Sequence, residues 1–234
     1  MLASSVQRIL DTLPDDAIVL DIGGWGKPLK RADWVLDQMP YETRGLYGFD
    51  GDDPERFTAD TWVQRDICDR EPFPFEDGSI DFVTCSHTLE DVRDPVWVCQ
   101  EIARVGKAGY LETPSRLEEQ AWGVHGDWVG WSHHHWFVEA VPGGLEFVFK
   151  PHFVHSRPEA QVPRETWEAA SPEARVLQLW WEGTFTCTER TFVDPGAIDG
   201  YVADFAAAHG ARAGAPAPAA ARGLRGLKSR VTGR

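Results

Sequence analysis

The sequence predicts an α/β protein whose doubly wound sheet is mostly parallel and carries an antiparallel hairpin at one edge. Residues 17–22 form a nearly continuous apolar run, typical of a central strand that is buried on both faces of a parallel sheet. Residues 80–113 read as a strand, a helix and a second strand. Polar residues follow several of these strands, and such residues meet at the carboxyl edge of an open sheet, where ligands bind.

The amino-terminal half supplies most of the expected sheet. Residues 2–13 place leucine, isoleucine and valine at helical spacing, which predicts an amphipathic first helix. The connection from the first strand to a second strand at 34–37 is short, so the first crossover is trimmed and has little room for a full helix. The remaining elements expected here are a loop over 38–60, a strand that starts at Trp62, a helix that begins after Asp94-Pro95 and runs to Val105, and a strand over 110–113.

The carboxyl-terminal half has weaker patterns. Residues 136–141 and 145–149 flank Pro142-Gly143-Gly144, which is typical of a β-hairpin. From Gly210 the chain is rich in alanine, proline, glycine and arginine and lacks apolar periodicity, which predicts disorder. Further expected elements are a helix over 158–175, strands over 176–179 and 184–193, and a helix over 196–208.

Composition narrows the classes of function. The 234-residue chain has a net charge of −14 at pH 7, which argues against a nucleic-acid substrate, because phosphate binding depends on clustered cations. Residues 211–234 carry six basic and no acidic residues. No apolar run is long enough to cross a bilayer, and the first residues lack the pattern of a signal peptide. The four cysteines have no CxxC spacing, so we expect free thiols in a reducing, cytoplasmic setting.

Residues 66–115 resemble the second half of the class I S-adenosylmethionine-dependent methyltransferase domain. The resemblance rests on Asp66, on the loop with Phe73-Pro74-Phe75, and on a strand that exits at Ser86-His87. It extends less strongly back to residue 17. It implies a Rossmann-like fold, S-adenosylmethionine as the cofactor, and a small-molecule acceptor that is methylated on oxygen or nitrogen, such as a specialised metabolite or a sugar.

The same resemblance implies a division of the chain and a set of cofactor residues. The expected parts are a cofactor-binding core at 1–115, an acceptor-side cap of the same domain at 116–209, and a disordered basic tail at 210–234. A glycine turn after the first strand lets backbone approach the cofactor, and a carboxylate after the second strand accepts hydrogen bonds from its ribose. The implied cofactor-binding residues are Asp21, Gly23, Gly24 and Gly26 in the turn, Asp37 at the ribose, Asp66 and Ile67 at the adenine, and Ser86 near the sulfonium.

The glycine motif departs from the family pattern, and the ribose ligand has a second candidate. The usual motif would place glycines at positions 23, 25 and 27, but this chain has Trp25 and Lys27. Asp50 competes with Asp37 as the ribose ligand if residues 46–50 form the second strand. We favour Asp37.

Histidines are the candidates for chemistry on the acceptor. We predict catalytic roles for His87, His133 and His135, because a hydroxyl nucleophile needs a base with a pKa near neutrality. On an extended segment His133 and His135 would share one face and His134 would point to the other. The cluster could equally be structural. In a third reading His133 and His135 bind a metal together with His125, Asp127, His152 or His155, but the spacing fits no compact motif, so no metal is expected.

The tryptophans and the overall activity leave alternatives open. Trp122, Trp128 and Trp131 could line an acceptor pocket, or they could belong to the core or to a homodimer face. A methyltransferase-like binding or regulatory module without turnover stays open because of Trp25. A metal-assisted enzyme on the same scaffold is the third possibility, because a fold does not fix a reaction.

Overall fold

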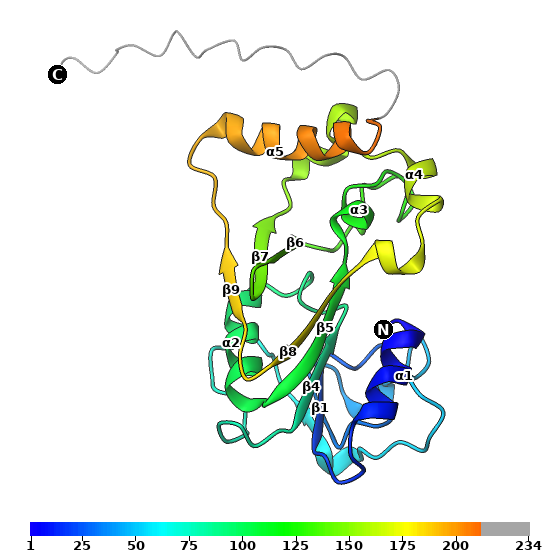
Figure 1. Cartoon of the computed structure of the whole chain (residues 1–234), viewed down its shortest axis with the longest axis vertical. Coiled ribbons are helices and arrows are strands. Elements are labelled where there is room, and N and C mark those ends of the chain that lie inside the picture. Colours follow the sequence, from blue (N-terminus) through cyan, green and yellow to red (C-terminus); the bar gives the residue numbers. More distant parts are fainter. Residues whose placement is uncertain (212–234) are drawn as a thin grey trace, which may run out of the picture.

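Six strands form the main sheet, in the order β3-β2-β1-β4-β5-β8. Figure 1 shows β1, β4, β5 and β8 of this sheet. The computed structural model describes residues 1–211. The first five strands run parallel, and β8 pairs antiparallel with β5 at the edge. This confirms the predicted fold class, a mostly parallel Rossmann-like sheet. The strands are β1 (Val19–Ile22), β2 (Trp34–Asp37), β3 (Trp62–Gln64), β4 (Phe82–Ser86), β5 (Ala108–Pro114) and β8 (Val176–Glu182).

The first crossover is trimmed, as predicted. Residues 23–33 join the parallel strands β1 and β2 without a helix. Arg31 is buried and donates hydrogen bonds to the carbonyls of Pro14 and Ala17, both at 2.9 Å. The Asp33 amide donates to the carbonyl of Val19 at 2.8 Å. Side-chain and backbone hydrogen bonds therefore hold in place a connection that in most parallel sheets a helix would cover.

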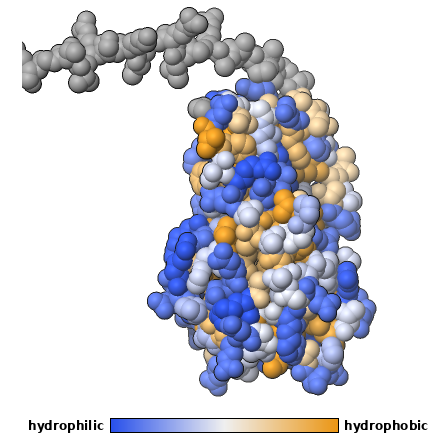
Figure 2. All heavy atoms as spheres, turned by 60° about the vertical axis from the view of Figure 1, so that its left-hand side comes forward, coloured by the Kyte–Doolittle hydropathy of each residue, from blue (hydrophilic) through white to orange (hydrophobic). Residues whose placement is uncertain are grey.

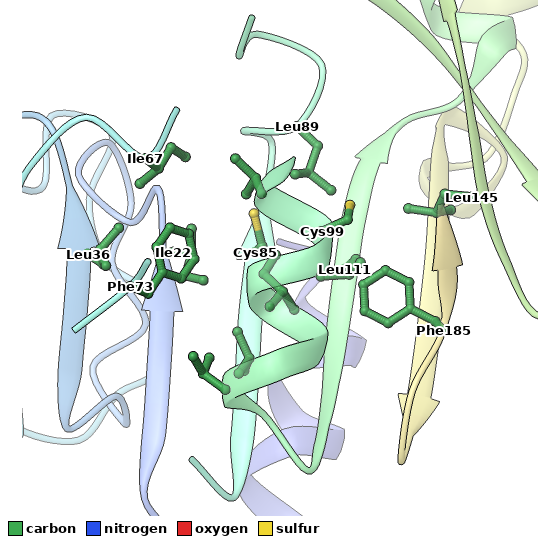
Figure 3. Close-up of a cluster of buried hydrophobic side chains, with 14 of the residues drawn as sticks. Ile22, Leu36, Ile67, Phe73, Cys85, Leu89, Cys99, Leu111, Leu145 and Phe185 are labelled. Atoms are coloured by element: carbon green, nitrogen blue, oxygen red, sulfur yellow. The ribbon is translucent and has the colours of Figure 1, made fainter. Parts of the chain in front are cut away.

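Helices cover both faces of the sheet. The amphipathic helix α1 (Ala3–Thr12) packs Val6 and Ile9 on one face. Helix α2 (Pro95–Val105) packs on the other face, where its Cys99 lies among buried side chains of the sheet (Figure 3). Asp94 caps α2 by accepting a hydrogen bond from the Trp97 amide at 3.1 Å.

The predicted hairpin exists but does not lie at the edge of the main sheet. Strands β6 (Trp136–Val141) and β7 (Gly144–Phe149) pair antiparallel, and β9 (Thr186–Glu189) joins β7 in parallel to form a second sheet of three strands. The antiparallel edge of the main sheet is β8 instead. Hydrophobic residues of the hairpin, such as Leu145 and Phe147, pack into the core that α2 forms with the main sheet. This burial explains why the hairpin lies beside the main sheet rather than extending it.

The segment expected as a helix over 158–175 is broken into short turns. A proline stands at or just before the start of each turn, at positions 158, 163 and 172, and proline cannot continue a helix that precedes it. The expected tail lies outside the described residues from 212 onward. The helical elements not yet named are η1 (Tyr41–Thr43), η2 (Ala59–Thr61), α3 (Arg116–Glu119), η3 (His152–His155), η4 (Pro158–Ala160), α4 (Arg164–Glu168), η5 (Pro172–Arg175) and α5 (Pro195–Ala208).

The surface is mixed in polarity. Figure 2 shows hydrophilic residues over much of one face, with hydrophobic residues interspersed among them. Large exposed hydrophobic side chains come from separate segments of the chain, for example Tyr47, Trp128 and Val193. Within residues 1–211, none of the helices has both the length and the apolar character needed to cross a membrane.

Candidate functional site

A cavity of about 860 Å³ opens at the carboxyl edge of the main sheet. Its walls come from the ends of β1, β2 and β4, so it includes the point where the strand order reverses. Every residue that the sequence assigned to the cofactor or to catalysis lines this cavity. The residues predicted for the cofactor define what we call the cofactor side of the cavity: Asp21, Gly23, Gly24, Gly26, Asp37, Asp66, Ile67 and Ser86. The residues predicted for catalysis, His87, His133 and His135, define what we call its acceptor side.

The turn after β1 requires its glycines. Gly23 has φ +71°, and a Cβ atom there would lie 2.1 Å from the hydroxyl of Thr88. A Cβ at Gly24 would lie 2.4 Å from the Asp21 carboxylate. Asp21 is buried and accepts hydrogen bonds from the Leu29 amide and the Thr84 hydroxyl, both at 2.9 Å. Burial raises the pKa of Asp21 to about 7, although both hydrogen bonds act to lower it. Asp21 thus organises the turn.

Asp37 occupies the position expected of a ribose ligand. It ends β2, lines the cavity and accepts hydrogen bonds from the amides of Trp25 at 3.0 Å and Met39 at 2.8 Å. Each carboxylate oxygen keeps a further lone pair for a ligand. Asp50, the competing candidate, is absent from the cavity wall and forms an ion pair with Lys27 at 2.6 Å. Residues 34–37 form the second strand and residues 46–50 do not.

Asp66 and Ile67 lie just after β3 in the chain, separated from it by Arg65. Asp66 accepts a hydrogen bond from the Cys68 amide at 2.8 Å, and its other oxygen lies 2.8 Å from the Arg93 guanidinium. Ile67 is 7% exposed and lies against the cavity. A flat ring could pack on Ile67 while its polar edge meets the Asp66 carboxylate.

His87 stands at the exit of β4 in an uncommon backbone conformation, with φ +52°. Its Nε2 atom lies 3.1 Å from the Glu112 carboxylate, which is 1% exposed. Burial alone would lower the pKa of His87, but the Glu112 and Glu90 carboxylates raise it to about 9. Burial likewise acts to raise the pKa of Glu112, and its hydrogen bonds with His87 and Tyr110 help to lower it to about 2. His87 and Glu112 therefore form an ion pair at neutral pH.

The three consecutive histidines precede β6 rather than belonging to it. Ser132 and His133 lie in a turn, and the strand begins at Trp136. The alternation of faces expected for an extended segment is therefore wrong, and all three histidines line the cavity. The His133 side chain is 57% exposed, whereas that of His134 is 6% exposed.

His134 is held by a buried ion pair. Its Nδ1 atom lies 2.5 Å from one oxygen of Glu119, and the other oxygen of Glu119 lies 2.7 Å from Nζ of Lys150. Glu119 and Lys150 are 1% and 2% exposed. Gly130, with φ +60°, passes so close that a Cβ would lie 2.7 Å from the Lys150 ammonium. The loop before the histidines is thus fixed by charge and by close packing.

The chain matches a known protein family in the region that forms the sheet edge. The family model for the methyltransferase domain matches residues 43–111, which span η2 to β5 and include Asp66, Ile67, Ser86 and His87. The matched residues belong to a methyltransferase domain. The cofactor that this domain implies is S-adenosylmethionine, and the cavity lies where the strand order of the sheet reverses.

Solved structures with detectable likeness to the methyltransferase domain align over part of their length. A methyltransferase of Mesorhizobium loti is 14% identical, with a TM-score of 0.35, over 64% of each chain. A Haloferax volcanii complex between the activator Trm112 and a methyltransferase gives 20% identity and a TM-score of 0.34, over 48% of this chain and 57% of the other. The chain thus spans less than two thirds of these structures. No curated protein matches.

Sequence reasoning missed three carboxylates and one histidine beside the cavity of the methyltransferase domain. His134, Glu90, Asp91 and Glu119 gather on the acceptor side, although they come from three separate segments of the sequence. Glu90 is 0% exposed, and the Thr-Leu-Glu-Asp sequence around it carries no signal of burial. The partners proposed for a metal, such as His152, are not among the residues of this cluster. Of the three tryptophans considered for the acceptor pocket, Trp131 lines the cavity and Trp122 and Trp128 do not.

Proposed function

We propose that this protein transfers the methyl group of S-adenosylmethionine to oxygen or nitrogen of a small molecule, such as a specialised metabolite or a sugar. One observation carries the proposal. A single cavity of about 860 Å³ is lined both by the turn and carboxylates of the methyltransferase domain and by the histidines of the carboxyl-terminal half. This volume is in the upper part of the range of small-molecule sites, roughly 300–1,000 Å³, so cofactor and acceptor can share it.

The cofactor-side residues take separate parts of the ligand. The Gly23–Gly26 turn receives the amino acid portion, Asp37 accepts hydrogen bonds from the ribose hydroxyls, and Asp66 with Ile67 holds the adenine. Ser86 lies after these residues in the chain, at the exit of β4, and faces the sulfonium. In this scheme residues 1–115 bind the cofactor, and residues 116–209 supply the cap that receives the acceptor.

In this scheme the exposed imidazoles of His133 and His135 remove the proton of the acceptor. Methyl transfer to a hydroxyl needs a base held near the nucleophile. His87 is protonated at neutral pH, so it orients Glu112 and does not accept a proton. His133 is open to the cavity, and burial together with the nearby His134 charge lowers its pKa, which keeps it neutral. His135 is exposed and lines the same wall, so both imidazoles can accept the proton.

The chemistry of the rest of the chain fits a small acceptor in the cytoplasm. The net charge of −14 disfavours a polyanionic substrate. The four cysteines, all within the described residues, are free thiols, and three of them are buried, as suits a reducing compartment.

Calorimetric titration with S-adenosylhomocysteine tests the cofactor half of the proposal. Asp37→Ala should weaken binding at least tenfold, because a hydrogen bond to a charged group contributes about 1.5–3 kcal/mol. Asp50→Ala is the matched control and should bind within about threefold of the wild type, with melting curves recorded for both variants. No binding to the wild type, or equal loss in both variants, would overturn the assignment. Binding without methyl transfer to any of a panel of hydroxyl and amino acceptors would instead favour the binding module.

A further inference from the structure

We propose that Asp91, His133 and His134, with Glu90 beside them, bind a divalent first-row transition-metal ion. The ligand atoms of Asp91, His133 and His134 all lie within 4.8 Å of one another. Oδ1 of Asp91 is 3.7 Å from Nε2 of His134 and 3.9 Å from Nε2 of His133. The loop after β4 and the turn before β6 bring these residues together at the cavity wall.

Glu90 is independent evidence for a ligand at this point. Its side chain is 0% exposed, and neither of its carboxylate oxygens accepts a hydrogen bond from any described residue. One oxygen lies 4.0 Å from Nε2 of His134 and 3.6 Å from Nδ1 of His87. Oδ1 of Asp91 is also buried and without a hydrogen bond. Burying a carboxylate without a partner is costly, so these oxygens point to a missing cation.

His134 is oriented as a metal ligand would be. Its Nδ1 atom faces Glu119 at 2.5 Å, so in the neutral ring the proton resides on Nδ1 and the lone pair on Nε2. That lone pair is directed toward Asp91 and Glu90. A carboxylate behind the far nitrogen is the usual support of a metal-binding histidine, because it fixes the tautomer and the ring.

The charges around the cluster call for a divalent cation. Lys150 neutralises Glu119, and His87 pairs with Glu112 at 3.1 Å, closer than it lies to Glu90. Among the described residues, the ion-pair partners of the Glu90 and Asp91 carboxylates are imidazoles, and none is a lysine or an arginine. One divalent ion between them balances both charges.

The donor set selects the class of metal. Two imidazoles with carboxylates suit Zn²⁺ and its first-row neighbours, whereas Mg²⁺ and Ca²⁺ take oxygen ligands. A tetrahedral ion with bonds of about 2.1 Å holds its ligand atoms about 3.4 Å apart. The ligand atoms here lie 3.7 Å to at most 4.8 Å apart, so binding an ion requires the side chains to close by about 0.3 to 1.4 Å. With an ion bound, His133 becomes a ligand, and His135 is the open imidazole that remains for the acceptor.

The test is a calorimetric titration of the full chain, without a histidine tag and stripped by a chelator, with Zn²⁺ and in parallel with Mg²⁺. We expect one Zn²⁺ per chain and no binding of Mg²⁺. Asp91→Asn and His134→Gln should each weaken Zn²⁺ binding at least a hundredfold. His152→Gln and His135→Gln are the controls, since neither residue belongs to the cluster, and both should bind as the wild type does.

Two further measurements keep the result interpretable. His133→Gln alters an exposed side chain, so it should lose Zn²⁺ affinity without a change in melting temperature, even if the buried variants fold poorly. S-adenosylhomocysteine titrated into the same samples separates this inference from the proposed function. Zn²⁺ binding that is absent, substoichiometric or unchanged in Asp91→Asn and His133→Gln would leave an adventitious ion only and overturn the site, whatever the cofactor result.

Discussion

The two sides of the cavity are built in different ways. On the cofactor side, residues at the ends of parallel strands are positioned by backbone amides, as Asp37 is by Trp25 and Met39. On the acceptor side, loop residues are positioned by buried charges, as His134 is by Glu119. The cofactor side should therefore be sensitive to any added volume or altered backbone, and the acceptor side to any lost charge.

The largest effect on ligand binding is expected from Gly23→Ala. A left-handed φ costs a residue with a side chain roughly 1–2 kcal/mol, and here the added methyl group would also meet Thr88. We expect binding of S-adenosylhomocysteine to fall at least a hundredfold in calorimetry. Gly78→Ala is the matched control, because Gly78 has φ +62° but open space around its Cβ position. Equal losses in the two variants would show that strain, rather than the shape of the turn, limits binding.

The acceptor side should respond most strongly to Lys150→Met. Removing Lys150 leaves the buried Glu119 carboxylate with His134 alone as its charged partner, so we expect the free energy of unfolding to fall by about 3 kcal/mol, the lower end of the range for a broken buried pair, in urea titrations. Lys107→Met breaks an ion pair with Asp81 of the same length, 2.7 Å, whose partners are 60% and 34% exposed. That variant should lose less than about 1 kcal/mol. A loss below 1 kcal/mol for Lys150→Met would mean that the loop is held by packing alone.

The sequence predicts the cofactor side of the cavity better than the acceptor side. Strand and helix patterns predicted β1, β2, β4, α2 and β5, and every cofactor candidate lies at the cavity, because the ends of parallel strands converge by geometry. The acceptor side could not be predicted in this way. Glu90, Glu119 and Lys150 are charged residues without periodicity, and their burial depends on contacts between distant segments. The alternation assumed for His133 to His135 failed because the strand starts only at Trp136.

A smaller effect, on the pH dependence of folding stability, is expected from the His87–Glu112 ion pair. The pKa of His87 rises from 6.5 to about 9 on folding, so its stabilising contribution is complete below pH 6.5 and is lost as the pH rises through 9. The pKa of Glu112 falls from 4.5 to about 2, so its contribution is present above pH 4.5 and is lost toward pH 2. The loss of stability in His87→Gln should therefore be greatest between pH 4.5 and 6.5.

Because the His87 side chain is 42% exposed, solvent screens the pair, and we expect that loss to be about 1 kcal/mol. Urea unfolding of the wild type and of His87→Gln at pH 5.5, 7.5 and 9.5 measures it. His152→Gln serves as the control for histidine titration elsewhere. A difference that stays constant across these pH values would show that His87 acts through its backbone conformation instead.

Strand β8 has a consequence for how such a protein can diversify. Pro114 at the end of β5 lies opposite Val176 at the start of β8, so the chain leaves the sheet and returns to neighbouring positions. After Glu182 it leaves again, and residues 183–211 join the acceptor side. Closing a loop costs only about 0.6 kcal/mol more for each doubling of its length. The two excursions could thus be exchanged together for others of different length and chemistry, while β8 stays as the common anchor and the strand ends that line the cavity are unchanged.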